Sequence, residues 1–474
     1  MRSEQRRTPL RAVVRAVGYT LICLPILASF LYVGEFGVNV PKTDTWVMAP
    51  LFEKLFSGEL SVGDLWAQHS EHRPLLPRIF LLLMGPLTHF NIVAIMYAIQ
   101  LCLLATFVCI FLAYRDTVGL DGKALFFAAP VSLLVFSLGQ YWNMFHAWSI
   151  HVVVVVSFGV LSFLLLNKLR GKGNRMTILL FLTSILSGSA ATLSAGHGLL
   201  VWPVGLMQLS LEPILVGRKK YLLTVWTLIG SVHWAVYFWG FKAPHNRMSH
   251  VYFFNNSTLG ADSFAGLIGS ALFQESGLAV TTGVVIGAIL VLVIFWIWRN
   301  REQSRYTFWI SLSAFSLLIL AATTVARSGQ GLDAVIPSKY VTFSVLLTTG
   351  VYVMSLQLAR DHSGLEFSAL PLGVCAGLIV LSAPLSYYAG VQNAEGVRMH
   401  NETAAFILAT YKNRTNACLE KAVYPQFWQP KITAKDGAAI FDGLNYTVFS
   451  EPTSEITREA NLAVKCGTHR RTYR

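Results

Sequence analysis

Residues 278–305 read LAVTTGVVIGAILVLVIFWIWRNREQSR, and stretches of this kind decide the fold. The first 21 of these residues carry no charge, and Arg299, Arg301 and Arg305 follow them at once. A helix needs about 20 consecutive apolar residues to cross the hydrocarbon core of a bilayer. Basic residues beside such a helix usually lie on its cytoplasmic side. The stretch therefore predicts a membrane-spanning helix with a cytoplasmic end after Trp298.

The composition of the whole chain agrees with this prediction. Of its 474 residues, 54% are hydrophobic and only 13% are charged, and the mean hydropathy is +0.54. A soluble domain carries roughly 25% charged residues. The net charge of +13 is large enough for a nucleic-acid binder, but much of the positive charge lies in short clusters between apolar runs. That distribution excludes nucleic acid as the expected partner and indicates membrane lipids instead.

Repeated apolar runs predict an all-α, polytopic membrane protein with about 11 transmembrane helices. The predicted spans cover residues 16–38, 91–114, 124–139, 152–168, 177–195, 199–217, 221–241, 278–298, 306–326, 341–359 and 367–389. The run from Leu75 to Leu87 is also apolar. Counting it as a span would place Arg115 and Lys123 outside and reverse every later loop, so we predict a helix lying on the membrane surface there.

The charges between the spans predict the orientation of the chain. Segments on one side carry Arg115, Lys123, Lys168, Arg170, Lys172, Arg175, Arg218, Lys219, Lys220, Arg299, Arg301, Arg305 and Arg360. The short turns near 140–151 and 195–198 carry no Lys or Arg. By the positive-inside rule the N-terminus lies in the cytoplasm, and an odd number of spans puts the C-terminus outside.

Three outward segments are long, namely 39–90, 242–277 and 390–474. We predict a transmembrane domain over residues 1–389, which includes the first outward loop 39–90, and a small extracytoplasmic segment over residues 390–474. That segment contains Cys418 and Cys466. Because the outer side is oxidising, a disulfide between them is plausible, and two unpaired thiols are the alternative.

The first outward loop has a readable local structure. Residues 41–78 read PKTDTWVMAPLFEKLFSGELSVGDLWAQHSEHRPLLPR. Apolar residues at helical spacing predict an amphipathic helix over Trp46–Phe56 that lies on the membrane and ends at Ser57-Gly58. Ser61 is a suitable cap for a short second helix through Trp66.

Most candidates for chemistry lie in this loop. Asp44 and Glu71 supply carboxylates, and His69, His72, Arg73 and Arg78 supply imidazoles and guanidiniums. This combination suits general-base activation of a hydroxyl and binding of a phosphate. The alternatives are ordinary surface polar groups and, for Asp44, a cap of the helix that follows. The His69–His72 spacing without a further clear ligand is a weak zinc signal, so no metal ligand is assigned.

Other outward turns add candidates for substrate and phosphate binding. The turn at 140–148 carries Gln140, Asn143 and His146 among aromatic residues, which alternatively form an interfacial belt. His197 lies in the Ser194–Gly198 re-entry. Arg327 and Lys339, followed by Tyr340, lie at the outer ends of neighbouring spans. These cations either neutralise a lipid-linked phosphate or only extend towards water.

These motifs together resemble the GT-C superfamily of integral-membrane glycosyltransferases, and more narrowly an uncharacterised bacterial GT-C-like family. The resemblance rests on Asp44-Thr45-Trp46, His69–Arg73, Gln140–Asn143, Gly198-Leu199 with Trp202-Pro203, and Ser338-Lys339-Tyr340. The order matches over residues 16–360. The single Asp44 departs from the paired acidic motif of many such enzymes, which leaves a divalent metal possible. Lys339 stands where arginine is expected, so the bidentate phosphate geometry is lost.

The resemblance implies an enzyme of the bacterial inner membrane that takes part in polysaccharide biosynthesis of the cell envelope. It would transfer a sugar from a polyprenyl-phosphate-linked donor to an extracytoplasmic glycan or lipid acceptor. Asp44 would be the base, with Glu71 a second acid candidate. Arg73, Arg78, Arg327 or Lys339 would bind the phosphate. A flippase of a lipid-linked glycan is one alternative, although few ionisable residues lie inside the spans. A glycan polymerase or ligase is the other.

Overall fold

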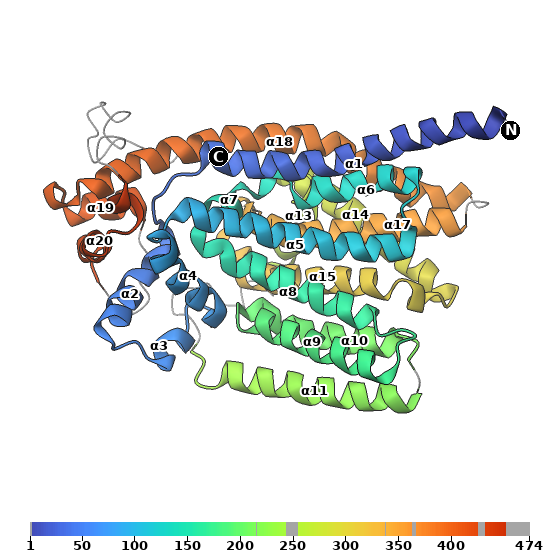
Figure 1. The fold of residues 1–474 in the computed structure, drawn as a ribbon, viewed down its shortest axis with the longest axis horizontal. Coiled ribbons are helices and arrows are strands. Elements are labelled where there is room, and N and C mark those ends of the chain that lie inside the picture. Colours follow the sequence, from blue (N-terminus) through green and yellow to red (C-terminus); the bar gives the residue numbers. More distant parts are fainter. Residues whose placement is uncertain are drawn as a thin grey trace. The chain divides into compact units, whose positions relative to one another are not determined.

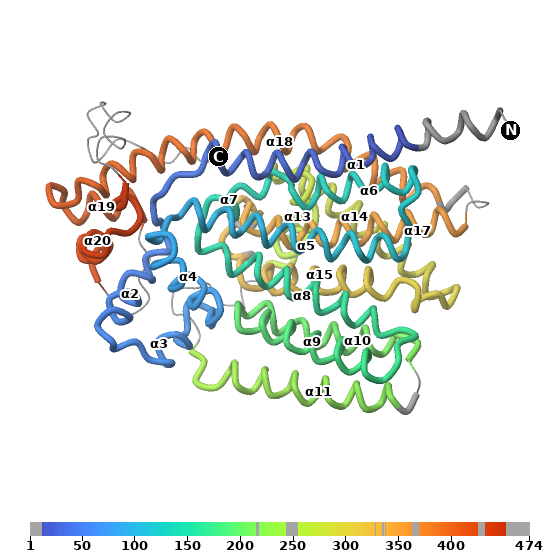
Figure 2. Tube along the Cα trace, viewed as in Figure 1, coloured from blue at the N-terminus to red at the C-terminus, as the bar shows by residue number. Residues whose placement is uncertain are grey.

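The computed structural model describes residues 2–214, 216–242, 255–336, 338–362, 366–424 and 432–451 (Figure 2). These residues form helices joined by short turns and contain no β-strand; a single isolated backbone bridge joins His69 and His72. The predicted all-α fold is therefore confirmed for this part of the chain.

Within the described residues, ten helices are long and apolar enough to cross a membrane. They run over Ala12–Phe36, Ile92–Val118, Gly122–Phe145, Ala147–Asn167, Asn174–Thr192, Arg218–Phe238, Ser276–Arg299, Thr307–Arg327, Ser338–Asp361 and Ala369–Ala409. Nine of the predicted spans overlap these helices closely, and the last one continues far beyond residue 389 as α18 (Glu366–Ala409). The chain is a multi-pass membrane protein. Which side each terminus faces stays a prediction.

One predicted span, 199–217, differs from the structure. Only an 11-residue helix, α10 (Val201–Leu211), occupies this stretch, after the 3-10 turn η4 (Gly196–Leu200). The helix ends because Pro213 follows Glu212, and a residue before proline is driven out of the helical conformation; Glu212 is extended, with ψ 137°. In Figure 1, α10 lies beside α9 (Asn174–Thr192) and α11 (Val216–Phe238), and it packs against both.

Packing divides the chain into two compact units. Unit 1 comprises Met1–Ser29, Leu101–Tyr141 and Val152–Gly390, and unit 2 comprises Phe30–Gln100, Trp142–His151 and Val391–Arg474. The predicted domain boundary near residue 389 stays a prediction.

The interior of unit 1 is built around α17 (Val341–Asp361), whose residues 341–358 are all buried. Its neighbour α15 (Thr307–Arg327) lies against it (Figure 1). The two helices approach closely at Gly350, where an added Cβ would lie 2.3 Å from the Ser313 hydroxyl oxygen. Other helices of this unit include α6 (Gly122–Val135), α8 (Ile150–Asn167), α13 (Ser257–Gly269), α14 (Ser276–Arg299) and α16 (Leu332–Val335).

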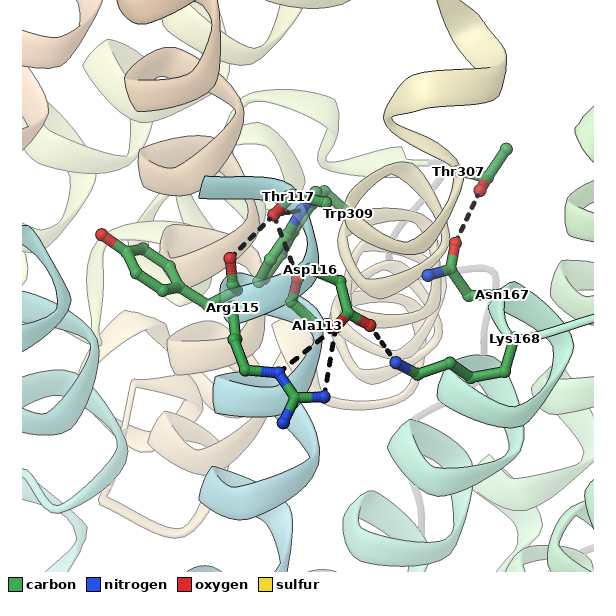
Figure 3. Close-up of polar contacts among 9 residues, drawn as sticks. Ala113, Arg115, Asp116, Thr117, Asn167, Lys168, Thr307 and Trp309 are labelled. Atoms are coloured by element: carbon green, nitrogen blue, oxygen red, sulfur yellow. Dashed lines mark hydrogen bonds and ion pairs between the residues drawn. The ribbon is translucent and has the colours of Figure 1, made fainter. Parts of the chain in front are cut away.

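Basic segments of unit 1 meet at one end of the helices. Asp116, near the end of α5 (Ile92–Val118), accepts hydrogen bonds from Arg115 and Lys168, and Thr307 donates to the Asn167 amide oxygen at 3.1 Å (Figure 3). Further ion pairs there join Arg360 to Asp121 at 3.2 Å and Arg305 to Asp361 at 3.0 Å. Segments predicted to share the cytoplasmic side thus lie at the same end of this unit.

Unit 2 combines the first outward loop with the C-terminal segment. The loop contains η1 (Thr43–Val47), α2 (Met48–Ser57), α3 (Val62–Trp66) and α4 (Leu75–Thr88). The C-terminal segment adds η8 (Tyr411–Asn413), α19 (Asn416–Val423), α20 (Ala434–Gly443) and η9 (Thr447–Ser450), and α20 packs against α2 (Figure 1). Cys418 in α19 is disulfide-bonded, and Cys466 lies outside the described residues.

The local predictions for the loop agree with these helices. Gly58 ends α2 in a left-handed conformation, φ 76°. Ser61 and Asp64 form a capping box at the start of α3. The 14 residues of α4 are too few to cross a bilayer, as expected of the run from Leu75 to Leu87.

Candidate functional site

Asp44 lies in a single turn of 3-10 helix directly after the first span. This turn, η1, covers Thr43–Val47, and Thr43 has a positive φ of 50°. A β-branched residue rarely adopts this conformation, which costs roughly 1–3 kcal/mol and persists only when the surroundings impose it. Trp46 is fully buried, and its indole nitrogen donates a hydrogen bond to the Pro41 carbonyl at 2.8 Å. The backbone around Asp44 is therefore strained at Thr43, and the buried Trp46 fixes it on the C-terminal side.

The Asp44 carboxylate pairs with the His69 imidazole. The distance from His69 Nε2 to Asp44 Oδ1 is 3.1 Å, and the two side chains are 4% and 29% exposed. Burial lowers the pKa of His69, although the hydrogen bond and charge of Asp44 act in the opposite direction. Because an ionised carboxylate only accepts hydrogen bonds, a neutral His69 carries its hydrogen on Nε2 and donates it to Asp44.

A tight two-residue turn presents His69. The His69 N–H donates to the His72 carbonyl at 2.8 Å, and the His72 N–H donates to the His69 carbonyl at 2.9 Å. Ser70, in the turn, has a positive φ of 55°. Its hydroxyl donates to the Glu71 carboxylate. The sequence therefore places His69 and His72 side by side at the base of a turn, with Glu71 at its tip.

The segment 142–151 contributes further aromatic and imidazole rings to unit 2. The Trp148 ring centre lies 4.6 Å from that of His69, and the His151 ring centre lies 5.6 Å from that of His72. His151 was not among the residues predicted from the sequence. It is the second residue of α8, where it belongs by spacing to an apolar run, so only its nearness to His146 in the chain could have drawn attention to it.

His146 interacts electrostatically with Asp44 and with Lys42, a lysine that was not predicted from the sequence. The His146 ring stacks on Trp142 with centres 4.0 Å apart. Burial, and then the positive charge of Lys42, lowers the pKa of His146, while the charge of Asp44 raises it. Burial lowers the pKa of Lys42 itself to about 7. Lys42 stands two residues before Asp44, which was the available signal.

The two loop arginines hold the end of α3. Arg78 is 2% exposed, and its Nη1 donates to the carbonyls of Leu65 at 2.9 Å and Ala67 at 2.5 Å. Arg73 Nη1 donates to the Trp66 carbonyl at 3.2 Å, and its guanidinium lies 5.3 Å from the Trp66 ring centre. Both guanidiniums thus satisfy carbonyls that a helix leaves free at its C-terminus. A phosphate-binding role for either stays a prediction.

The position of Asp44 also bears on the alternative that it is only a helix cap. Lys42 is the N-cap residue of η1 and Val47 that of α2, and neither helix has a side-chain cap hydrogen bond. Asp44 lies inside η1, and its carboxylate faces His69.

The remaining candidates lie mainly in unit 1, where the structure brings three sequence segments together. The Thr342 hydroxyl donates to the Gln140 amide oxygen at 2.7 Å. The Gly139 carbonyl accepts from the Ser338 hydroxyl at 2.6 Å and from the Gln274 amide at 2.5 Å. Gln140 is therefore buried in a joint between η2 (Leu138–Gln140) and the start of α17.

Four further residues predicted for the site lie on other turns and helices. His197 in η4 lies with its ring centre 5.0 Å from that of Phe343, close to the same joint. Lys339 Nζ is 5.0 Å from the ring centre of its neighbour Tyr340. Arg327 is the last residue of α15. Asn143 is buried in α7 (Tyr141–Phe145) and belongs to unit 2.

The described residues contain no group of three or more His, Cys, Asp or Glu side chains that could hold a metal ion. The imidazoles of His69 and His72 pack against the rings of Trp148 and His151, respectively. A requirement for a divalent metal stays an open prediction.

Comparison with known proteins gives structural neighbours only. No family model and no curated protein matches the sequence. The structure is similar to that of ArnT from Cupriavidus metallidurans in the apo state, with 12% sequence identity, a TM-score of 0.44, and coverage of 93% of this chain and 89% of that chain. It is also similar to the same protein bound to undecaprenyl phosphate, with 12% identity, a TM-score of 0.43, and coverage of 90% and 88%.

Proposed function

We propose that this protein is a membrane glycosyltransferase. It transfers a sugar from a polyprenyl-phosphate-linked donor to a glycan or lipid acceptor on the outer side of the membrane, with Asp44 as the general base. The sugar and its lipid carrier come from the sequence resemblance. The role of Asp44 is supported by its geometry.

The reaction assigns one proton transfer to Asp44. An acceptor hydroxyl attacks the anomeric carbon of the donor sugar and gives its proton to the Asp44 carboxylate. The new carbon–oxygen bond forms as the bond between the anomeric carbon and the phosphate oxygen breaks, and polyprenyl phosphate leaves with the bonding electrons. A positioned base of this kind typically contributes about 10²–10⁴-fold to the rate.

One observation carries the proposal: Asp44, which lies on a strained turn, pairs with the buried His69. The His69 Nε2 lies 3.1 Å from Asp44 Oδ1, and this hydrogen bond fixes the orientation of the carboxylate that takes the proton of the acceptor. A neutral histidine orients the carboxylate without adding a positive charge that would make it a weaker base. Strained backbone such as that of Thr43 clusters at functional sites.

Lys42 is a candidate within unit 2 for the negative charge of the donor. Its pKa of about 7 leaves the amine partly protonated at neutral pH, and a bound phosphate would favour the protonated form. Its charge already acts on His146, as does that of Asp44. We therefore add Lys42 to the predicted phosphate-binding residues, alongside Arg73, Arg78, Arg327 and Lys339.

Asp44→Asn tests the proposal. Asparagine keeps the shape and accepts the hydrogen bond from His69, but it cannot take a proton. We expect a loss of transfer of about 10²–10⁴-fold with unchanged expression and membrane insertion. The assay uses purified protein in liposomes with radiolabelled polyprenyl-phosphate sugars as donors and cell-envelope glycans and lipids as acceptors.

Asp116→Asn is the matched control. It removes one carboxylate from the charged end of unit 1, where Arg115 and Lys168 bind it. This variant is expected to transfer sugar at the parental rate. Full activity of Asp44→Asn would end the assignment of the base, and no transfer by the parent with any donor would end the proposed function.

A further inference from the structure

The C-terminal segment packs on the turn that carries Asp44. Trp46, two residues after Asp44, is fully buried, and its ring meets the edge of Phe441 in α20 with centres 5.5 Å apart. Both residues belong to unit 2. Phe441, almost 400 positions from Asp44 in the sequence, therefore limits the movement of the η1 turn.

Phe441 is itself held by an aromatic cluster from three parts of the chain. Its ring stacks on Phe90 with centres 5.9 Å apart, and Phe90 meets Phe52 at 4.8 Å. Phe52 also meets Tyr446 at 5.0 Å. All of these rings are buried, so Phe441 has little freedom to turn away from Trp46.

Polar contacts fasten the same two parts of unit 2. The Thr447 N–H donates to the His89 carbonyl at 2.8 Å. The buried Asn39 amide donates to the Glu451 carboxylate at 2.7 Å and accepts from the Ile92 N–H at 2.8 Å. Because Asn39 lies just before the Lys42–Val47 stretch, the C-terminal segment fastens the loop on both sides of Asp44.

This arrangement matters because the η1 turn is poorly stabilised by itself. It is one turn long, and Thr43 holds a strained conformation that only its surroundings can maintain. A catalytic group displaced by about 1 Å can lose roughly 10²-fold in rate. The packing of Trp46 is thus needed to keep the Asp44 carboxylate in its position.

We propose that Phe441 is a positioning residue for Asp44 and that the C-terminal segment 432–451 is an integral part of the transfer site. The proposal rests on the proposed function for its effect on transfer. Its structural content, that Phe441 restrains residues 43–47 through Trp46, holds independently of the reaction.

Phe441→Ala tests both parts. Hydrogen–deuterium exchange of peptides covering residues 39–48, measured without substrate, is expected to accelerate at least tenfold. The kcat for transfer is expected to fall about 10- to 100-fold, while KM for the donor changes less than threefold. Phe441→Tyr keeps the ring and should restore most of both properties.

Phe449→Ala is the matched control. Phe449 belongs to the same segment, but its ring contacts Tyr411 at 5.7 Å within the C-terminal part. It should leave exchange of residues 39–48 and kcat at parental values. If Phe441→Ala is not recovered as folded protein, Phe441→Val is expected to change both readouts in the same direction by at least threefold.

The outcomes separate the two proposals. Parental exchange of residues 39–48 in the purified Phe441 variant would overturn the positioning role, whatever the transfer rate. Equal acceleration in Phe449→Ala would also overturn it, because the effect would then be a general loosening of the segment. A parent that transfers no sugar would overturn only the proposed function.

Discussion

Two histidines, one in each compact unit, pair with a carboxylate and contact a tryptophan ring. His69 lies 3.1 Å from Asp44 and 4.6 Å, centre to centre, from Trp148. His362 lies 3.5 Å from Glu302 and 4.1 Å from Trp296. The side chain of His69 is 4% exposed, whereas that of His362 is 26% exposed at the charged end of unit 1.

The surroundings give these similar pairs different consequences. Glu302 also faces Arg305 at 3.8 Å, and Arg305, whose side chain is 48% exposed, pairs with Asp361 at 3.0 Å, so charge is shared in a partly exposed network. Exposed pairs of this kind contribute about 0–1 kcal/mol to stability. At His69, burial lowers the pKa and favours a neutral donor that orients one carboxylate. The burial of the histidine, more than residue type, therefore distinguishes the candidate site.

The largest expected effect concerns Arg78, the buried arginine at the end of α3. Arg78→Ala removes a side chain that is 2% exposed and that donates to the carbonyls of Leu65 and Ala67. Hydrogen bonds made by a charged group contribute about 1.5–3 kcal/mol each, so we expect a loss of about 3 kcal/mol in unfolding free energy. Thermal unfolding of the purified protein measures it. Arg305→Ala, at the charged end, should lose less than about 1 kcal/mol. Equal losses would contradict the comparison.

The next effect tests the two histidines directly. His69→Ala removes the donor that orients Asp44, and we expect kcat for transfer to fall about 10- to 100-fold, or about 1.4–2.7 kcal/mol. His362→Ala should keep the parental kcat. His69→Gln can still donate a hydrogen bond and should recover part of the lost rate. A parental kcat for His69→Ala would remove His69 from the site.

The smallest effect is a pH dependence. The pKa of Lys42 is about 7 in the folded protein and about 10.5 in the unfolded chain, so between these values the unfolded chain binds more protons. Stability therefore rises with pH above 7, by about 1 kcal/mol between pH 7 and 8. Lys42→Met should flatten this rise, whereas Lys168→Met, which changes a lysine paired with Asp116, should not. Thermal unfolding of the three proteins at pH 7 and 8 checks this prediction, and an unchanged slope in Lys42→Met would refute it.

Several features of the site were predictable because their signals are local. The amphipathic pattern after Asp44 predicted a helix over 46–56, and α2 covers Met48–Ser57. Ser61 with Asp64, and Gly58, marked the start of α3 and the end of α2 through capping and a left-handed residue. The failure at 199–217 was also local: apolar character was counted, but the effect of Pro213 on Glu212 was not.

The sequence by itself determined the membrane class, most of the spans and the residue types available in the first loop, because length, hydropathy and capping act between near neighbours. Only the tertiary structure decided that His69 faces Asp44, that His151 lies beside His72, and that Phe441 packs on Trp46. These contacts join residues 25 to nearly 400 positions apart. Their burial, which lowers the pKa of His69, depends on the whole packed unit and not on any one stretch of chain.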